Sequence, residues 1–437
     1  MVMTNPPFGK NLKVRAEIGR QEDLLTCRKW RRSDGPNAQW EPTDEWIEQQ
    51  LGVVFFERAL RLLRAGGRLA IVLPETFLFS SSFRWFVDWI ARATTITHVV
   101  DVPMVAFEEF CRAKTCLVFV QKTPPPRGHQ IMMSFPKSIG QDKYGKPLYL
   151  RNDRGERESG DLDNEMADAV KHLVSLDYSE KPSPRRVAER RSERRDRYAF
   201  AVSQANARSR GVLVPRFWWR EETNAALYAW TRQHPSELVT LGSLEERGIL
   251  RTFTGHGSPP GHSRKTGDVP YVKVTDLKNW RVNENPTNFI SRSIAARLRR
   301  RGPEPQYGDL VTPSRASSNI GQFSLVLPWQ THVVFTKEVL ILRVEKSDEG
   351  IDPFLMLALL SLKVVQDQYA NLVLMQTNRD DLGDRWREVL IPMPRTREER
   401  ESVARPVRDY FEGIVQAREA YDRLLRAIGP DALGSRP

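Results

Sequence analysis

The chain has 437 residues, 40% of them hydrophobic and 28% charged, so it is long enough for two or three domains with substantial cores. Its formal net charge of +12 indicates a polyanionic partner, although a charge balance alone does not identify one. No apolar run reaches the roughly 18 residues of a membrane span and no signal peptide opens the chain, so we expect a cytoplasmic protein without a membrane partner. The spacing of Cys27, Cys111 and Cys116 fits neither a disulfide framework nor a zinc site, so we expect reduced thiols and no metal.

The chain opens with a short apolar run, Met1–Met3, followed by Thr4-Asn5-Pro6-Pro7-Phe8-Gly9-Lys10. This order predicts a buried strand that ends in a rigid loop, because two consecutive prolines fix φ and hold Asn5 extended with its carboxamide presented outward. Open α/β sheets place their ligand sites at the carboxyl ends of the strands. Taken alone, the segment Asn5–Phe8 is as well explained by an ordinary turn.

Residues 11–42 are polar and charged, and we expect a long functional loop there. Two interpretations are open for its cations, contact with phosphates or a solvated flap. The cations concerned are Lys10, which ends the opening motif, and Lys13, Arg28, Lys29, Arg31 and Arg32.

An alternation of helices and strands follows. Thr43 and Asp44 offer the N-cap of a helix that continues through Leu62 and is stopped by Gly66-Gly67. The further predicted elements are a strand at 68–74, a helix at 82–92 and strands at 96–102, 115–121 and 129–134. The order strand–helix–strand–helix–strand predicts a doubly wound α/β sheet, and we assign residues 1–150 to this first domain.

Residues 151–235 are predicted to form a basic helical linker. Its segment Lys181–Arg210 holds ten Lys or Arg residues against three Asp or Glu. Such runs are most often solvated faces, whereas contact with phosphates is favoured if the protein modifies DNA. The arginines assigned to that contact are Arg185, Arg186, Arg190 and Arg191.

From residue 236 the pattern changes, and residues 236–395 are predicted to form a mixed α+β domain with a helix at 353–369 and a strand at 389–394. Its loop Ser314–Gly321 contains one Arg, three Ser, one Asn and one Gly. Arg reads guanine edges and Asn reads adenine edges through paired hydrogen bonds. Arg315, Ser317 and Asn319 are therefore candidate DNA-binding residues, and the alternative is a plain turn between two strands.

The last segment, residues 396–437, is predicted to be one long helix. It starts with a capping box formed by Thr396 and Glu399. Apolar residues then follow at alternating spacings of four and three, which is a heptad pattern suited to packing on a partner helix or on its own domain. Pro406 interrupts this pattern and indicates a later start, and Gly429-Pro430 indicates the end.

The motif Thr4-Asn5-Pro6-Pro7-Phe8-Gly9 resembles the catalytic motif of amino-directed DNA adenine methyltransferases. Segments downstream are similar to those of the modification subunits of type I restriction–modification systems and their relatives. The resemblance covers roughly the first 150 residues and is carried further by Phe56-Glu57-Arg58, Leu62–Pro74, Phe107 and Lys114–Lys122.

This resemblance implies transfer of a methyl group from S-adenosylmethionine to N6 of adenine, a poor nucleophile because its lone pair is delocalised into the ring. The side-chain oxygen of Asn5 and the carbonyl of Pro6 would accept the two N6 hydrogens, and Phe8 would stack on the base extruded from the duplex. A direct displacement at an activated methyl group depends mainly on positioning and calls for no covalent nucleophile.

Such enzymes bind S-adenosylmethionine through a Gly-rich strand–loop–helix that precedes the Asn-Pro-Pro-Phe loop, and almost nothing precedes Asn5 here. Gly255-His256-Gly257 is followed by Ser-Pro-Pro and is too rich in proline to open a helix. We therefore expect the cofactor to be bound mainly by a missing N-terminal half or by a partner chain, this chain being either a split subunit or a product that begins at an internal methionine.

Residues 236–395 are similar to a target-recognition domain of a type I specificity subunit. The expected fold is a partial Rossmann-like α/β methyltransferase sheet, then a mixed α+β target-recognition domain and a C-terminal long helix. The expected function is that of a nucleoid-associated, site-specific adenine-N6 methyltransferase subunit of a restriction–modification or phage-defence system, acting with a partner chain on double-stranded DNA. The alternative is a catalytically silent, sequence-specific DNA-binding protein, and an RNA or protein methyltransferase is a weaker third.

Overall fold

The computed structural model describes residues 1–9, 11–35, 38–107, 113–152, 154–175, 199–263, 265–283, 286–345, 349–376 and 379–428. The chain divides into two compact units. Unit 1 comprises Met1–Glu221 and Leu374–Asn378, and unit 2 comprises Glu222–Val373 and Arg379–Pro437. The chain therefore leaves unit 1, builds most of unit 2, returns briefly to unit 1 and leaves it again.

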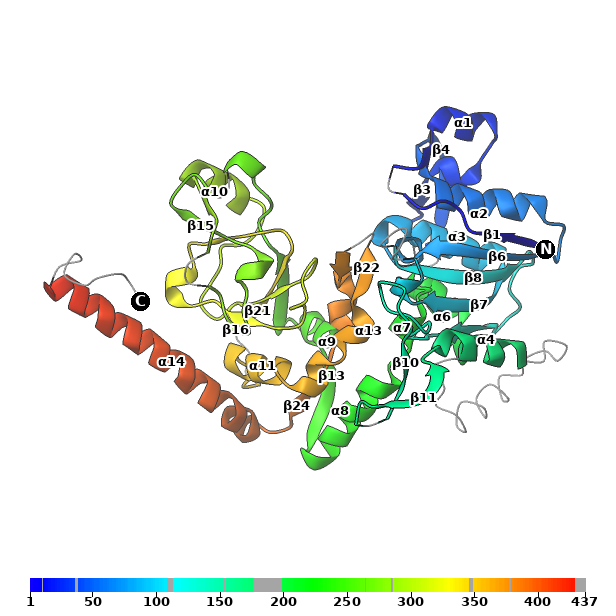
Figure 1. The fold of residues 1–437 in the computed structure, drawn as a ribbon. Helices are drawn as coiled ribbons and strands as arrows, with labels where there is room; N and C mark the ends of the chain where they lie inside the picture. Colours follow the sequence, from blue (N-terminus) through cyan, green and yellow to red (C-terminus); the bar gives the residue numbers. More distant parts are fainter. Residues whose placement is uncertain are drawn as a thin grey trace. The chain divides into compact units, whose positions relative to one another are not determined.

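Unit 1 is built on a six-stranded mixed sheet with the order β1-β6-β8-β7-β9-β12, whose first strands lie side by side in Figure 1. Its strands are β1 (Val2–Thr4), β6 (Arg68–Pro74), β7 (Thr95–Val102), β8 (Thr115–Gln121), β9 (Gln130–Ser134) and β12 (Phe200–Ser203). β1 pairs with β6 in parallel, whereas β8 runs antiparallel to both β6 and β7. Because β8 alone is reversed between them, the carboxyl ends of β1, β6 and β7 meet at one edge of the sheet, where β8 begins.

The expected strands at 68–74 and 115–121 are confirmed as β6 and β8, and those at 96–102 and 129–134 differ from β7 and β9 by one residue. β12 belongs to the same sheet, so this part of the predicted linker 151–235 forms a strand of unit 1. The basic cluster Arg185–Arg191 lies outside the described residues. The α/β class is confirmed as a mixed sheet with flanking helices, and the Rossmann-like description is taken up below as a proposal.

Helices and a small hairpin complete unit 1. The helices are α1 (Ala16–Gln21), α2 (Leu51–Leu62), α3 (Arg84–Ala93), α4 (Glu165–Ser175), α6 (Gln204–Arg210) and α7 (Pro215–Trp218), and the hairpin pairs β10 (Tyr149–Arg151) with β11 (Arg157–Leu162). α2 packs on β6 and α3 packs on β7. An aromatic core joins the two helices, with the rings of Phe56 and Phe86 5.4 Å apart and Trp89 6.0 Å from each.

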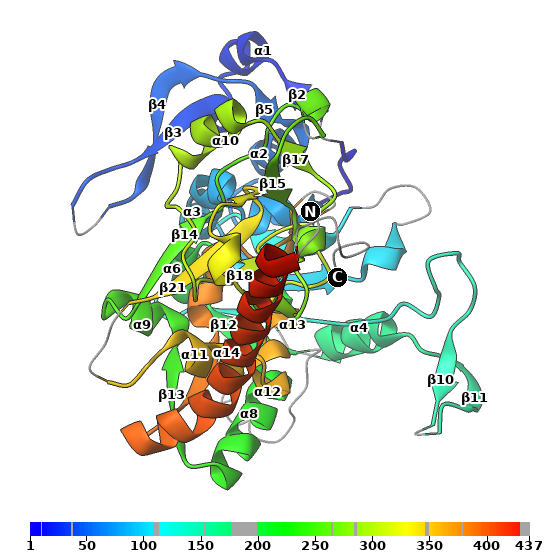
Figure 2. The ribbon, with the colours of Figure 1, turned by 90° about the vertical axis from the view of Figure 1, so that its left-hand side faces the viewer.

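The prediction of a structureless loop at 11–42 and a helix N-cap at Thr43 is wrong. The segment folds into short elements, and Thr43 and Asp44 lie in a strand that pairs with β3 (Figure 2). Trp30 is buried and stacks on Trp85 at 5.0 Å, and Lys29 pairs with Glu45 across the hairpin at 2.8 Å. These contacts join residues far apart in sequence. The elements are β2 (Lys13–Val14), α1, a 3-10 turn η1 (Leu25–Cys27), β3 (Arg28–Arg32), β4 (Trp40–Trp46) and β5 (Gln49–Gln50), after which α2 begins at Leu51.

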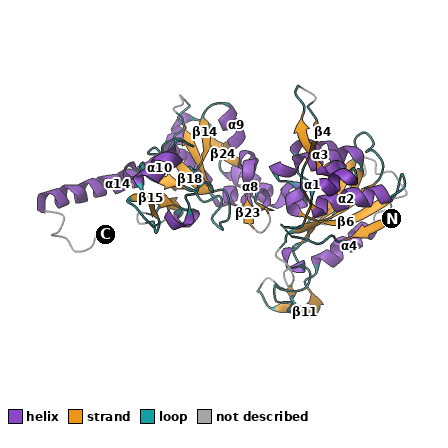
Figure 3. Ribbon diagram, turned by 90° about the horizontal axis from the view of Figure 1, so that it is seen from above, coloured by secondary structure: helices purple, strands orange, loops and turns teal. Residues whose placement is uncertain are grey.

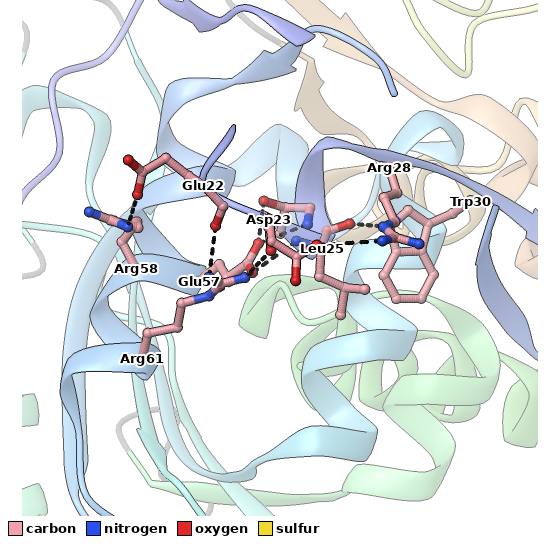
Figure 4. A network of polar contacts seen from close by, with 9 residues as sticks. Glu22, Asp23, Leu25, Arg28, Trp30, Glu57, Arg58 and Arg61 are labelled. Atoms are coloured by element: carbon pink, nitrogen blue, oxygen red, sulfur yellow. Dashed lines mark hydrogen bonds and ion pairs between the residues drawn. The ribbon is translucent and has the colours of Figure 1, made fainter. Parts of the chain in front are cut away.

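Glu57 on α2 ties this N-terminal segment to the sheet. Its carboxylate is buried and accepts hydrogen bonds from the backbone of Leu25 at 2.9 Å and of Thr26 at 2.8 Å, and from the Thr26 hydroxyl at 2.7 Å (Figure 4). Arg61, one turn later, donates to the same carboxylate at 2.6 Å. A single buried charge therefore satisfies two backbone donors and one hydroxyl donor of the 3-10 turn η1.

The described part of unit 2 is built on two main sheets and a separate strand pair. A five-stranded sheet has the order β14-β21-β18-β19-β16, a three-stranded sheet has the order β17-β15-β20, and β13 pairs separately with β24. The strands are β13 (Ser236–Thr240), β14 (Leu250–Thr254), β15 (Val269–Val272), β16 (Trp280–Arg281), β17 (Phe289–Ile290), β18 (Leu310–Pro313), β19 (Ser324–Leu325), β20 (Val334–Phe335), β21 (Val339–Val344), β23 (Arg379–Asp381) and β24 (Leu390–Pro394). β24 confirms the strand expected at 389–394. Buried Val, Leu, Ile and Phe residues from both sheets form the core.

The helices of unit 2 are drawn in purple in Figure 3. They are α8 (Glu221–Gln233), α9 (Leu241–Glu246), α10 (Arg292–Arg299), α11 (Pro353–Leu360), α12 (Lys363–Gln366), α13 (Tyr369–Leu372) and α14 (Arg397–Ile428). The single helix predicted at 353–369 is wrong, because the backbone of Leu362 is extended (φ −61°, ψ 131°) and separates α11 from α12.

The C-terminal helix α14 confirms the predicted capping box. The Thr396 hydroxyl accepts a hydrogen bond from the Glu399 N–H at 3.2 Å, and the Glu399 carboxylate accepts one from the Thr396 N–H at 3.0 Å. We had expected Pro406 to mark the start of the helix, but it lies inside the helix. Ala404, Val407 and Phe411 are buried on the side that packs against α11, so the first half of the helix belongs to the core of unit 2.

We expect Glu57→Ala to lower the free energy of unfolding of the chain by about 3–5 kcal/mol, because it leaves the loop donors and Arg61 without their buried partner. Urea titration followed by tryptophan fluorescence measures the loss. The matched control is Glu22→Ala in the same network, whose exposed carboxylate pairs with Arg58 at 2.7 Å and is expected to contribute far less. Equal losses in the two variants would contradict the role given to Glu57.

Candidate functional site

The loop that follows β1 lies at the sheet edge where β1, β6 and β7 end. Asn5 is exposed, Pro6 is buried and Phe8 is half-buried. The side chain of Asn5 makes no hydrogen bond within the described part of the chain, so its amide is available to a ligand. The strand before it is confirmed, but it is less buried than predicted, since Met1 and Met3 are 82% and 70% exposed.

Phe8 contacts an aromatic residue that follows β7, a strand that is not adjacent to β1 in the sheet. The rings of Phe8 and Phe107 lie 5.8 Å apart at 86°, an edge-to-face arrangement. Phe107 follows β7 and the 3-10 turn η4 (Met104–Ala106), and β6 and β8 lie between β1 and β7 in the sheet. The sequence analysis used Phe107 only as part of the family resemblance and did not place it in the site. Its position shortly after a strand that ends at the same edge was the available signal.

Three buried charges and one partly buried arginine lie at the same edge. Glu75 opens the 3-10 turn η2 (Glu75–Leu78) directly after β6, and its carboxylate pairs with Arg216 of α7 at 2.7 Å. Asp101 of β7 pairs with Lys114, whose ammonium group also donates to the carbonyl of Val102 at 2.7 Å. Both carboxylates are fully buried, and we name these four residues, Glu75, Asp101, Lys114 and Arg216, the edge cluster.

Burial raises the pKa of Glu75; Arg216 and Lys114 oppose that rise, and Asp101 adds to it. One carboxylate oxygen of Glu75, Oε2, has no hydrogen-bond partner among the described residues. Sequence reasoning missed the edge cluster, although charged residues inside or directly beside apolar strands were a usable signal.

The described residues of this edge offer few unengaged polar groups to S-adenosylmethionine. Cofactors of this kind need free backbone donors and an unengaged carboxylate for the ribose hydroxyls. Here Glu75 and Asp101 are buried and paired with cations, and the loop after β1 carries two prolines without N–H groups. Gly257, in the segment that was rejected as a cofactor loop, adopts φ +135° and lies in unit 2.

The predicted DNA-reading loop Ser314–Gly321 follows β18 in unit 2. Arg315 is half-exposed and its guanidinium pairs with Asp381 of β23 at 2.6 Å. Ser317 is half-buried and its hydroxyl accepts a hydrogen bond from the backbone of Asn319 at 3.1 Å. The side-chain oxygen of Asn319 accepts a hydrogen bond from the Ser318 hydroxyl at 3.5 Å, so all three predicted residues are engaged by other described residues.

Other cations differ in how they are placed. Arg28 and Lys29 pair with acidic residues of β4, and Lys13 pairs with Glu48. Arg31 and Arg32 are without an ion pair in the described parts of the chain. Exposed arginines without an ion pair to any described residue also lie on and just after α10, and sequence reasoning passed over them: Arg297, Arg300 and Arg301. Lys10, Arg185, Arg186, Arg190 and Arg191 lie outside the described residues.

Neither a membrane span nor a metal cluster is found in the described ranges. No helix in the described ranges is both long enough and apolar enough to cross a bilayer. The same residues contain no group of three or more His, Cys, Asp or Glu side chains that could hold a metal ion.

Unit 1 contains a segment that matches a known protein family. Residues 1–157 match the N-6 DNA methylase family. The matched segment contains β1, the loop Asn5–Gly9, Phe107 and three of the four residues of the edge cluster. The resemblance that the sequence analysis described for this part of the chain is confirmed. No curated protein matched the chain in sequence.

Solved structures similar to this chain come from restriction–modification systems. The type IIG restriction endonuclease BpuSI is 12% identical, with a TM-score of 0.35, over 93% of this chain and 48% of that one. The type I methyltransferase subunit from Streptococcus thermophilus is 16% identical, with a TM-score of 0.25, over 40% and 32%. The type I S subunit from M. genitalium is 13% identical, with a TM-score of 0.29, over 44% and 43%. The matches span less than half of each of those chains, and similarities this low do not establish a shared activity.

The two described cysteines should be chemically silent. Burial, with a smaller contribution from Glu57, raises the pKa of Cys27 to about 11, and burial next to Asp101 and Glu75 raises that of Cys116 well above its ordinary value. Only the thiolate is alkylated, so at pH 8 we expect iodoacetamide to leave both residues unmodified in the native chain and to modify both in urea. Labelling should increase only as the pH approaches that of the raised pKa. Peptide mass spectrometry identifies each site, and rapid native labelling of Cys116 would contradict its placement in the edge cluster.

Proposed function

We propose that the chain is a subunit of a site-specific DNA adenine-N6 methyltransferase of a restriction–modification or phage-defence system. It supplies the loop that holds the target adenine and the unit that recognises DNA, and a partner chain supplies the S-adenosylmethionine half. The observation that carries the proposal is the exposed Asn5 with the buried Pro6 at a sheet edge, followed closely by Phe8, whose ring contacts that of Phe107. The partial Rossmann-like reading of this sheet is part of the same proposal.

In this proposal the residues of the loop act on the amino group of adenine. The side-chain oxygen of Asn5 and the carbonyl of Pro6 accept its two hydrogens, which frees the nitrogen lone pair from conjugation with the ring. Pro6 is buried, its ring fixes φ, and the following Pro7 restricts its ψ to the extended range, so the direction of the Pro6 carbonyl is limited by the backbone itself. S-adenosylmethionine, when bound by the partner, supplies the methyl group.

Phe8 offers the face on which the extruded base stacks, and Phe107 holds Phe8 by an edge-to-face contact. In an edge-to-face pair one ring presents its edge to a face of the other, so Phe107 covers at most one face of Phe8. The two aromatic residues thus have different tasks, one toward the base and one toward the other ring.

DNA recognition is proposed for unit 2, through Arg315, Ser317 and Asn319 at base edges and through basic residues at phosphates. Arg297, Arg300 and Arg301 add exposed positive charge in the same unit, where phosphate contacts would fix the register of the duplex. The net charge of +12 supports a DNA partner in general terms. The alternative stated from the sequence, a catalytically silent DNA-binding protein, is an outcome that the experiments below would reveal.

The purified chain should bind S-adenosylmethionine negligibly, because the described edge residues are buried or already paired. Isothermal titration calorimetry of the chain alone should give no measurable heat, and binding should appear after mixing with the protein encoded immediately upstream. Micromolar affinity of the chain by itself would show that the cofactor half is not missing.

Asn5→Ala in the reconstituted complex should reduce methyl transfer by about 10²–10³-fold, as is typical when one polar contact to a developing charge is removed. Specific DNA binding should remain near that of the wild type, because the interaction is made mainly in the transition state. Methyl incorporation and gel-shift titration on the same duplex measure the two effects. The control is Asn11→Ala, an exposed Asn next to the same loop, and if both variants methylate at the wild-type rate the silent DNA-binding protein becomes the better account.

A further inference from the structure

The loop after β14, residues 255–258, is held in place within unit 2 by a buried histidine. His256 is 1% exposed, and both of its ring nitrogens are bonded to the backbone. Its Nδ1 accepts a hydrogen bond from the N–H of Phe335 at 3.1 Å, and its Nε2 donates to the carbonyl of Pro303 at 3.0 Å. These opposite roles require a neutral imidazole, and burial lowers the pKa of His256 accordingly. The histidine therefore joins the loop both to β20 and to the segment that follows α10.

The next residue, Gly257, allows this loop to lie close to α10. Its φ of +135° is one that residues with a side chain rarely adopt, and a Cβ at this position would lie 3.2 Å from Cδ2 of Leu298. The same Cβ would lie 3.7 Å from Nη1 of Arg301. The buried Tyr271 fixes the loop further, because its hydroxyl donates to the Gly257 carbonyl at 3.2 Å. The guanidinium of Arg301 thus lies beside a loop that is itself held in position.

Positive charge is concentrated at the C-terminal end of α10. Residues 292–303 include five arginines and no Asp or Glu. Arg297, Arg300 and Arg301 are exposed and form no ion pair with a described residue. Their spacings of three and four place them on one side of the helical turns. Because α10 packs on β15 and β20, which lie close to it in Figure 1, these cations are presented by a fixed element.

Two roles for these cations can be distinguished. Cations at the C-terminus of a helix interact favourably with its dipole, and this role involves the helix alone. The loop beside Arg301 offers further donors, since the N–H groups of Gly257 and Ser258 and the Ser258 hydroxyl bond to no residue in the described ranges. A guanidinium next to unengaged N–H and O–H groups is the donor set that phosphate oxygens accept.

We propose that Arg301, Ser258 and the backbone of Gly257 bind one phosphate of the DNA backbone, and that Arg297 and Arg300 extend this site along the strand. The site deepens the proposed function and rests on it for the identity of the ligand. A phosphate contact carries no sequence information and fixes the position of the duplex on unit 2. It differs in this from the loop Ser314–Gly321, whose proposed contacts are with base edges.

The site can be tested by titrating duplex DNA with the full-length chain at several salt concentrations. One phosphate contact contributes about −0.9 to the slope of log K against log salt, so Arg301→Ala should make the slope shallower by about 0.9 and weaken binding similarly for all sequences. The matched control is Arg405→Ala, which removes an exposed arginine of α14 and the same unit of charge, and which should leave the slope unchanged. Thermal unfolding of Arg301→Ala should follow that of the wild type. A role in the helix alone would lower the midpoint of unfolding without changing the slope.

A second pair of variants tests the loop side of the site. Ser258→Asp places a carboxylate next to Arg301, where it should occupy the guanidinium and repel a phosphate, so it too should make the slope shallower by about 0.9. Ser402→Asp, at an exposed serine of α14, changes the net charge equally and should not. Equal effects within each pair would show that only the net charge matters, and would refute the site.

An unchanged slope in Arg301→Ala also refutes the site, while duplex binding by the wild-type chain continues to support the proposed function. Failure of the wild-type chain to bind any duplex refutes both.

Discussion

The edge of the unit 1 sheet depends on a constraint of electrostatics, since charges in a nonpolar interior are stabilised only when each has its partner in place. Glu75 and Asp101 are both fully buried there, and Arg216 and Lys114 balance them. Replacing such a group as a whole by apolar residues is often neutral for stability, whereas removing one member is costly. The edge cluster therefore tells us little about how stable the unit is. It fixes the ends of β6, β7 and β8 relative to α7, at the edge that carries Asn5.

Elements with a strong local pattern were predictable from the sequence. β6 and β8 are continuous apolar runs bounded by turn residues, and their bounds matched. The hairpin β3–β4 was not predicted, because the contacts that form it join residues distant in sequence. These contacts are the stacking of Trp30 on Trp85 and the pairing of Lys29 with Glu45. The predicted helix at 353–369 failed for another reason. Its first part, α11, is apolar on nearly every side, so no period in the sequence marks where it ends.

The same distinction applies to the candidate site. The motif around Asn5 is local, and two prolines next to an Asn are visible without any structure. Its environment is not local, since Phe107 follows a strand that is separated from β1 by two other strands of the sheet, and Arg216 is 141 residues from Glu75 in the chain. The pairing of Arg315 with Asp381 is likewise a tertiary contact, and it changes the reading of Arg315 from a free base-reading side chain to one that already has a partner.

Asn5 and Arg315 thus present opposite situations to DNA. Asn5 is exposed and its amide is unengaged by the described residues, so a base that reaches it meets no competing bond. Arg315 has to give up a charge-assisted bond with a carboxylate before it can bind anything else. Only a ligand that offers a comparable bond, such as a phosphate or the paired acceptors of a guanine edge, repays that exchange. If unit 2 reads DNA as proposed, the pairing of Arg315 with Asp381 lowers the affinity for every DNA sequence. The loss is largest for sequences in which Arg315 finds no such acceptors. Because specificity is a difference between affinities, the pairing would increase it.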